Sequence, residues 1–371
     1  MDPDWQKIRA NYPATENYTY FNTASCGLIS TANLNCNQRY QNLLGQQGSV
    51  YRDTLFDEMQ KVKTAVGGFI QTEPENIALI PNFSSGMNYI VPMLKSLGSV
   101  LLIENDYPSL TLPWQLHNYE VHWVPQNPPQ ASKDTINLDQ IAETLRAKSI
   151  KILAISWVQY ATGFTVAIKQ LSNICKENNT LLVVDATQAL GAIPIDLTDT
   201  PVDILMGSCY KWATAGFGNG ILYIHPDVVA QFDTPVIGKG STGLYDSVYQ
   251  PEKMGLQARI FEVGHHNYGA FLVLSQTLNE INEMGIHNIY NRVLTLTQYF
   301  KERLPEQYTI ISDYAPEQST GIVAIKSRDS KIIEKLKQEK IIISARGEGL
   351  RISMHFYNTL EEVDHLLQVL S

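Results

Sequence analysis

A carboxylate and a lysine stand at the ends of two apolar segments of the chain. Asp185 closes the segment Leu181–Asp185, and Lys211 comes shortly after the segment Ile204–Ser208. Apolar and aromatic neighbours could desolvate the lysine, which would lower its pKa and free its amine for Schiff-base chemistry. Each residue alone has a plainer explanation, because an aspartate often caps a turn and a lysine often extends to solvent.

Two more apolar segments lead into side chains that could bind a ligand. The segment Ile77–Ile80 is followed by Ser84, Ser85 and Gly86, where a helix is expected to begin. Free backbone N–H groups and the positive end of the helix dipole could bind an anion there, although the serines could instead simply cap the helix. Tyr107 follows the next apolar segment and could stack on a planar ligand or only pack locally.

Together these features match the requirements of pyridoxal phosphate (PLP). This cofactor needs a lysine for its aldehyde, a carboxylate for its pyridine nitrogen, an anion site for its phosphate and an aromatic side chain over its ring. The four segments supply one of each. We therefore expect a PLP site in which Lys211, Asp185 and Tyr107 take part in catalysis.

The elements that must position these residues alternate between strands and helices. Such alternation is typical of an α/β fold with a mostly parallel sheet covered by helices on both faces, and ligands bind beyond the carboxyl ends of its strands. Seven strands are expected, at Asn76–Ile80, Ser99–Glu104, His122–Val124, Ile152–Ser156, Leu181–Asp185, Ile204–Ser208 and Ile221–Ile224. Helices are expected between them at Gly86–Leu97, Leu138–Ala147 and Ala167–Glu177.

The character of the chain changes after about residue 235. A loop is expected over Val236–Glu262, followed by helices near Tyr268–Met284 and Ile289–Leu304. Short strands are expected further on, at Gly321–Ile325, Ile341–Ser344 and Leu350–Ser353. We predict a large α/β domain over residues 16–260 and a smaller α+β domain over 261–371, to which the N-terminal arm of residues 1–15 also belongs.

Composition narrows the class of protein. Hydrophobic residues make up 44% of the 371 residues and charged ones 18%, which is typical of an ordered globular chain. The net charge of −9 argues against nucleic-acid binding, and no apolar run is long enough to span a membrane. The first residues lack the features of a signal peptide, and four cysteines without a CxxC motif are too few for a disulfide framework. We expect a cytoplasmic protein.

Three longer motifs make the chain similar to a known family. They are Val184-Asp185-Ala186-Thr187-Gln188, Ser208-Cys209-Tyr210-Lys211-Trp212 and the segment Leu350–Thr359 with the acidic residues after it. The sequence resembles the class V aminotransferases of fold type I, which include cysteine desulfurases, selenocysteine lyases and isopenicillin-N-epimerase-like proteins. The resemblance runs from about Tyr20 to the C-terminus.

The resemblance implies a role for each matching residue. Lys211 would form the Schiff base and transfer the proton, and Asp185 would pair with the pyridine nitrogen. Arg351 would bind the α-carboxylate of an amino-acid or keto-acid substrate, because a guanidinium offers two parallel donors. Further contacts would come from Gln188 and Gln159 to the ring oxygen, from Ser84, Ser85, Gly86, Ser208 and Tyr210 to the phosphate, and from Tyr107 stacked on the ring.

The resemblance also implies a homodimer with shared active sites. The segment Phe261–Asn267 would reach the phosphate site of the neighbouring subunit, with His265 in the place of the usual threonine. Asn22, in the N-terminal stretch Asn22–Gly27, would line the substrate pocket together with the loop Val236–Glu262. No metal site is expected at the adjacent histidines, because no carboxylate or cysteine pair accompanies them.

The sharpest departure from the family is an absent cysteine. Cysteine desulfurases carry a catalytic cysteine shortly before the substrate arginine, yet this chain has none after Cys209, and Ser344–Gly349 contains no thiol. We therefore expect no desulfurase chemistry of that kind, and we expect Cys209, taken as the only thiol beside the lysine, to be a buried residue.

Transamination is the expected reaction. Racemisation or epimerisation, with Tyr107 as a second acid–base group, and elimination at sulfur remain open. A cofactor-binding protein without catalysis is disfavoured, since the chain has no room for a separate DNA-binding module.

Overall fold

The computed structural model describes residues 3–126, 136–229, 231–232, 238, 257–327, 331–346 and 349–371. Most of the loop expected over 236–262 lies outside these residues, including Gly240, Gly243 and Gly255. Gly347 and Glu348, just before the segment of Arg351, also lie outside them. No helix in the described part of the chain is both long enough and apolar enough to cross a membrane.

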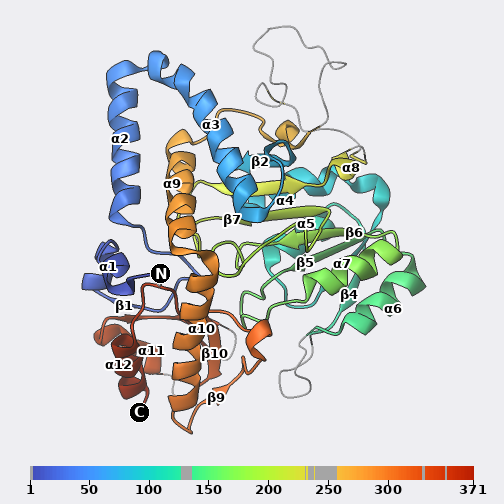
Figure 1. The fold of residues 1–371 in the computed structure, drawn as a ribbon. Helices are drawn as coiled ribbons and strands as arrows, with labels where there is room; N and C mark the ends of the chain where they lie inside the picture. Colours follow the sequence, from blue (N-terminus) through green and yellow to red (C-terminus); the bar gives the residue numbers. More distant parts are fainter. Residues whose placement is uncertain are drawn as a thin grey trace.

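A seven-stranded sheet forms the centre of the molecule, as expected (Figure 1). Its strands pair in the order β2–β8–β7–β6–β5–β3–β4. β8 is antiparallel to both neighbours, while the pairs β7–β6, β6–β5, β5–β3 and β3–β4 are parallel. Their bounds are β2 (Ile77–Ile80), β3 (Ser99–Ile103), β4 (Glu120–Val124), β5 (Ile152–Ser156), β6 (Leu181–Asp185), β7 (Ile204–Ser208) and β8 (Gly220–Ile224).

Helices bury both faces of this sheet. Alternate strand residues point to opposite faces, so Leu153 and Val184 join one apolar cluster while Ala154 and Val183 join another. The second cluster is covered by α4 (Phe83–Met93) and α5 (Pro108–Leu116). The first is covered by α3 (Ser49–Ile70), α6 (Leu138–Lys148), α7 (Ile168–Glu177) and α9 (Tyr268–Met284).

The start of α4 differs from the sequence prediction. The helix begins at Phe83 rather than at Gly86, because the side chain of Asn82 caps it by accepting a hydrogen bond from the Ser85 N–H at 2.9 Å. Neither serine is the capping residue. Pro92 stands next to the last residue of the helix, so it disrupts little of the helical hydrogen bonding.

A second sheet carries the C-terminal segment. It is antiparallel in the order β12–β13–β10–β9. Its strands are β9 (Thr309–Ile310), β10 (Ile322–Lys326), β12 (Ser344–Arg346) and β13 (Gly349–Ser353). Three helices contribute to the same apolar cluster as these strands: α10 (Ile286–Arg303), α11 (Ile332–Gln338) and α12 (Leu360–Leu370). The short helix α8 (Pro226–Val229) instead follows β8 of the large sheet.

The N-terminal segment joins this C-terminal part. β1 (Thr19–Tyr20) pairs with β11 (Ile341–Ile342), and Figure 1 shows α1 (Trp5–Arg9) close to the C-terminal helices. By contrast, α9 packs against α2 (Thr31–Gln47) and α3 beside the large sheet. The next helix, α10, continues from the end of α9 towards the small sheet. The division at residue 260 stays a prediction.

The carboxyl ends of the parallel strands meet at one edge of the large sheet. Ser156 at the end of β5 lies beside Asp185 at the end of β6, and Ser208 ends β7 beside the first residue of β8. β2 has the same direction as β7, because both are antiparallel to β8. The start of α4 is therefore at this edge as well.

Candidate active site

A cavity of about 380 Å³ lies at this edge of the sheet. Segments far apart in the chain contribute to its wall, because the ends of several strands meet there. It includes five of the predicted site residues. The lining residues are Pro81, Asn82, Phe83, Ser84, Tyr107, Thr187, Ser208, Tyr210, Lys211, Phe217 and Gly218.

Lys211 is buried in the wall of this cavity. Only 7% of the residue is exposed, and burial lowers the pKa of its amine to about 8, an effect that the negative charge of Asp185 opposes. The Nζ atom lies 5.6 Å from the ring centroid of Tyr107 and 5.7 Å from that of Tyr210. The backbone of Lys211 is packed closely against Gly27, because a Cβ atom at Gly27 would lie only 2.0 Å from the Lys211 carbonyl oxygen.

Asp185 lies next to Lys211 at the end of β6. Its Oδ1 atom accepts a hydrogen bond from the Thr187 N–H at 2.8 Å, and no cation lies within ion-pair distance among the residues that the structure describes. Burial raises the pKa of the carboxyl to about 6, while the Thr187 hydrogen bonds and the charge of Lys211 act in the opposite direction. A buried carboxylate without a cationic partner is suited to a protonated ring nitrogen.

Asp106 is a buried member of the site that the sequence analysis did not single out. It accepts hydrogen bonds from the Ser156 hydroxyl at 2.6 Å, from the Tyr107 N–H at 2.7 Å and from the Gln159 amide at 3.3 Å. Burial raises its pKa, and these donors lower it. Asp106 thus holds Tyr107 and Gln159 in place. Its position just after a strand end was the signal that could have identified it.

The two predicted glutamines already have partners within the protein. The Gln188 amide nitrogen donates to the Ala24 carbonyl at 3.0 Å, and its oxygen accepts from the Trp212 indole at 2.7 Å. Gln159 donates to Asp106 and accepts from the Gln126 amide at 2.8 Å. Both glutamines therefore fix the walls of the site. Their predicted contacts with the ring oxygen stay predictions.

The start of α4 offers one backbone donor to the cavity. The Phe83 N–H donates to the Ser208 hydroxyl at 2.9 Å, and the Ser85 N–H is taken by Asn82. Within the described residues the Ser84 N–H has no acceptor, and the Ser84 hydroxyl contacts that of Ser109 at 3.0 Å. A free N–H at a helix N-terminus that lines a cavity is suited to a phosphate oxygen.

The other six predicted cofactor residues do not line the cavity: Asp185, Gln159, Gln188, Ser85, Gly86 and His265. Gly86 packs the helix onto the sheet, since a Cβ atom there would lie 2.7 Å from Ile80 and 3.0 Å from Met206. Ser85 lies in the first turn of α4 but outside the lining. His265 is exposed and contacts the Tyr268 hydroxyl at 3.1 Å, so its predicted role in a neighbouring subunit stays a prediction.

Arg351 is a buried cation on β13, with 2% of the residue exposed. Its guanidinium donates to the Tyr160 carbonyl at 2.7 Å and to the Ser25 hydroxyl at 2.6 Å. The Nε atom is buried without a partner, and no carboxylate pairs with the guanidinium in the described ranges. Burial and the nearby charge of Arg346 lower the pKa to about 10, which leaves the group cationic at neutral pH.

Asn22 lies beside Arg351 and, like Arg351, is not among the residues that line the cavity, so its predicted role in substrate binding stays a prediction. Its side-chain oxygen accepts a hydrogen bond from Ser344 at 2.5 Å, and Ser344 in turn contacts the Ser25 hydroxyl at 3.0 Å. Its backbone forms a bridge with Ser353 of β13. The structure therefore brings the N-terminal stretch and β13 together around Arg351.

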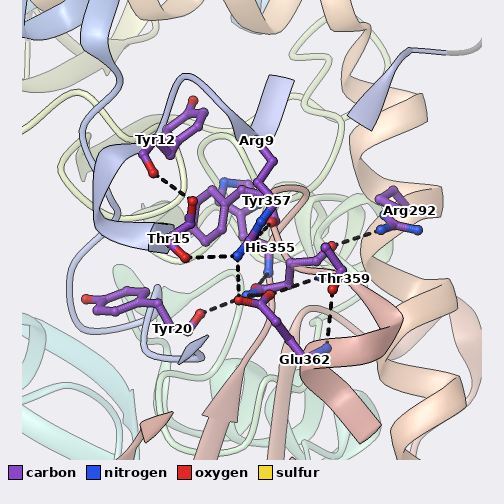
Figure 2. A network of polar contacts seen from close by, with 10 residues as sticks. Arg9, Tyr12, Thr15, Tyr20, Arg292, His355, Tyr357, Thr359 and Glu362 are labelled. Carbon is purple, nitrogen blue, oxygen red and sulfur yellow. Dashed lines mark hydrogen bonds and ion pairs between the residues drawn. The ribbon is translucent and has the colours of Figure 1, made fainter. Parts of the chain in front are cut away.

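The C-terminal signature is bound to the N-terminal arm by the network in Figure 2. Arg9 forms an ion pair with Glu362 at 2.9 Å and donates to the Tyr357 carbonyl at 2.6 Å. His355 of the same signature hydrogen-bonds the carbonyl of Trp212 at 2.8 Å. Since Trp212 follows the lysine, this network fixes the backbone beside Lys211.

The cysteine prediction needs one correction. Cys26, not only Cys209, lies close to the lysine, because Cys26 and Lys211 perturb each other's pKa and the Gly27 N–H bonds the Tyr210 carbonyl at 2.9 Å. Burial nevertheless raises the pKa of the Cys26 thiol above its usual value. Cys209 is fully buried, and burial raises its pKa to about 12. The contact with Cys26 depends on packing between distant segments, which the local sequence does not reveal.

This fold and the residues around its cavity define a PLP-dependent enzyme of fold type I. The match extends along the chain, because the sequence model of the class V aminotransferases covers residues 20–366. The protein belongs to the aminotransferase class-V family.

Three curated relatives illustrate the range of reactions in the family. An uncharacterized aminotransferase, YcbU of Bacillus subtilis, is 24% identical over 98% of this chain and 96% of its own length. A probable cysteine desulfurase of Pyrococcus abyssi is 25% identical over the same shares. Isopenicillin N epimerase of Streptomyces clavuligerus is 23% identical over 99% of this chain and 98% of its own length.

A solved structure shows the same fold. A mutant of C-DES with glycine covalently linked to its PLP cofactor superimposes with a TM-score of 0.90 at 20% identity, over 99% of both chains. PLP is the cofactor of this family, and the described residues fit it. Among the described residues, the buried amine of Lys211 and a free helix N–H line the cavity, and the Asp185 carboxylate, which has no ion-pair partner, lies near that amine.

Proposed function

We propose that this protein is an aminotransferase that moves an amino group between an amino acid and a keto acid. The observation that carries the proposal is the burial of Lys211 in one cavity wall beside Asp185. Class V membership and the PLP cofactor leave the reaction itself open, because the relatives include an epimerase and a probable desulfurase.

Each side chain has one task in this proposal. When bound, PLP supplies an electron sink for the negative charge that develops at the substrate Cα atom. Lys211 would take the Cα proton and pass it to the cofactor rather than back to Cα, which an amine with a pKa near 8 can do at neutral pH. Asp185 holds the ring nitrogen proton by an ion pair in a buried site. Arg351 binds the α-carboxylate, and Tyr107 covers the ring.

The available thiols do not favour desulfurase chemistry. The sequence has no cysteine after Cys209, so no thiol can act from the stretch before Arg351. Attack on a substrate sulfur requires a thiolate, and burial raises the pKa of both Cys26 and Cys209. We therefore propose no catalytic cysteine.

The test is a matched panel of amino donors and keto-acid acceptors with the cofactor-loaded protein. Transamination gives a keto acid from the donor and a new amino acid from the acceptor in equal amounts, measured by chromatography. Lys211→Arg is the control, because it keeps the charge but removes the reactive amine. Loss of optical purity without keto acid would instead indicate racemisation, and release of reduced sulfur would indicate elimination. Either result would overturn the transaminase proposal.

A homodimer in the cytoplasm remains part of the proposal. Support comes from the exposed position of His265 and from Phe217, which is 67% exposed although it stacks on Tyr210 at the cavity. A second subunit would cover these groups. Sedimentation of the cofactor-loaded protein tests this, and a monomer that is fully active would contradict it.

A further inference from the structure

A second arginine lies next to Arg351. Arg346 is at the end of β12, one strand over in the small sheet, and its Nη2 atom lies 3.5 Å from the Ser25 hydroxyl oxygen. The Nη2 atom of Arg351 lies 2.6 Å from the same oxygen. These two nitrogens therefore lie at most 6.1 Å apart, the sum of those two distances.

A chain of hydroxyl groups decides which atoms donate and which accept in the contacts of Ser25 with the two arginines. Ser344 donates to the Asn22 side-chain oxygen, so in its contact with Ser25 the Ser344 oxygen must accept. The Ser25 hydroxyl hydrogen is then used, and its oxygen offers only lone pairs to the two arginines. Asn22, Ser344 and Ser25 thus orient both guanidinium groups without neutralising either.

Neither arginine has an acidic partner in the described part of the chain. Among the described residues, Arg346 donates to the Ala345 carbonyl at 2.9 Å and to Ser25. Arg351 contacts neutral oxygens, and its buried Nε atom has no partner. Two positive charges held this close repel each other, and each disfavours a further cation nearby. Two bound anionic groups would offset this repulsion.

We propose that Arg351 and Arg346 form a two-carboxylate subsite that selects dicarboxylic amino acids and keto acids of four or five carbons. The inference rests on the proposed function, in which Arg351 binds the α-carboxylate. Buried Arg351 takes that group, and exposed Arg346 takes the side-chain carboxylate nearer to solvent. The two guanidinium groups are close enough for one such molecule to reach both.

Binding of unreactive acids tests the subsite without turnover. Succinate and butyrate have the same number of carbon atoms, but succinate has two carboxylates and butyrate has one. Each acid is titrated calorimetrically into the cofactor-loaded protein. Succinate should bind about tenfold more tightly or better, since one hydrogen-bonded charge pair supplies that factor. In Arg346→Gln this advantage should disappear while butyrate affinity is unchanged, and Arg346→Lys should restore part of it.

Three results would overturn the inference. They are equal binding of succinate and butyrate by the native protein, an unchanged preference in Arg346→Gln, and a parallel loss of both ligands in that variant. The last would mean a structural role for Arg346. These outcomes do not depend on the reaction, because a racemase or lyase would keep the preference while failing the keto-acid assay.

Discussion

The amine of Lys211 is expected to titrate near pH 8 in the protein without cofactor. Burial is the main cause, because the ammonium loses hydration, and the charges of Arg351 and Arg346 act in the same direction. A change from 10.5 to about 8 corresponds to roughly 3 kcal/mol. Only 7% of the residue is exposed, so solvent screens little of this.

Competitive acetylation of the apoprotein over a series of pH values measures this pKa directly. Peptide mass spectrometry gives the extent of labelling at each lysine. Labelling of Lys211 should be half-maximal near pH 8. Lys61, whose exposed amine has a pKa raised by its hydrogen bond with Glu58, should still gain reactivity at pH 10 and is the internal reference.

Asp185→Asn is the most informative variant in this assay. The carboxylate opposes the effect of burial, so its removal should lower the Lys211 midpoint further, by about one pH unit. A native midpoint at or above pH 10 would refute the reasoning from burial. A midpoint that rises in Asp185→Asn would refute the assigned role of the carboxylate.

Three further predictions concern residues around the site. Cys26→Ser should keep turnover within about twofold, because the half-buried thiol has a raised pKa and is not a nucleophile; a loss of a hundredfold would contradict this. Arg9→Ala should lower the free energy of unfolding by about 1–3 kcal/mol in urea titrations, because it breaks a partly buried ion pair and two hydrogen bonds to carbonyl groups. The control Lys7→Ala, on the same helix, should change the free energy of unfolding by less than about 0.5 kcal/mol. The buried imidazole of His355 has its pKa lowered to about 3, so the unfolded chain binds an extra proton below pH 6.5 and stability falls as pH falls towards 3. In His355→Gln this component, roughly 1.4 kcal/mol per pH unit, should be missing from the acid limb of the stability curve.

The strands of the large sheet were predictable because their signal is local. Segments such as Ile152–Ser156 and Leu181–Asp185 are apolar up to their last residue, as expected for strands covered on both faces, and their bounds match the structure. The start of α4 was less predictable. The cap at Asn82 depends on one side-chain rotamer, and Ser84 and Ser85 are equally plausible caps from sequence.

Some site residues could not be recognised locally. Asp106 has the same position after a strand as Asp185, but its importance comes from donors on β5 and beyond, about 50 positions later. Arg346 has no sequence signal at all. It becomes notable only because Ser25, 321 positions earlier, lies beside it.

The sequence by itself determined the large-sheet strands and the placement of Lys211 and Asp185 at their carboxyl ends, since apolar runs and strand-end positions are properties of short segments. Only the tertiary structure decided which distant groups meet there: Cys26 near the lysine, His355 on the Trp212 carbonyl, and two arginines on one serine hydroxyl. The physical reason is that these contacts arise from packing of the N-terminal stretch and the small sheet against the large one. No periodicity in a short segment encodes that packing.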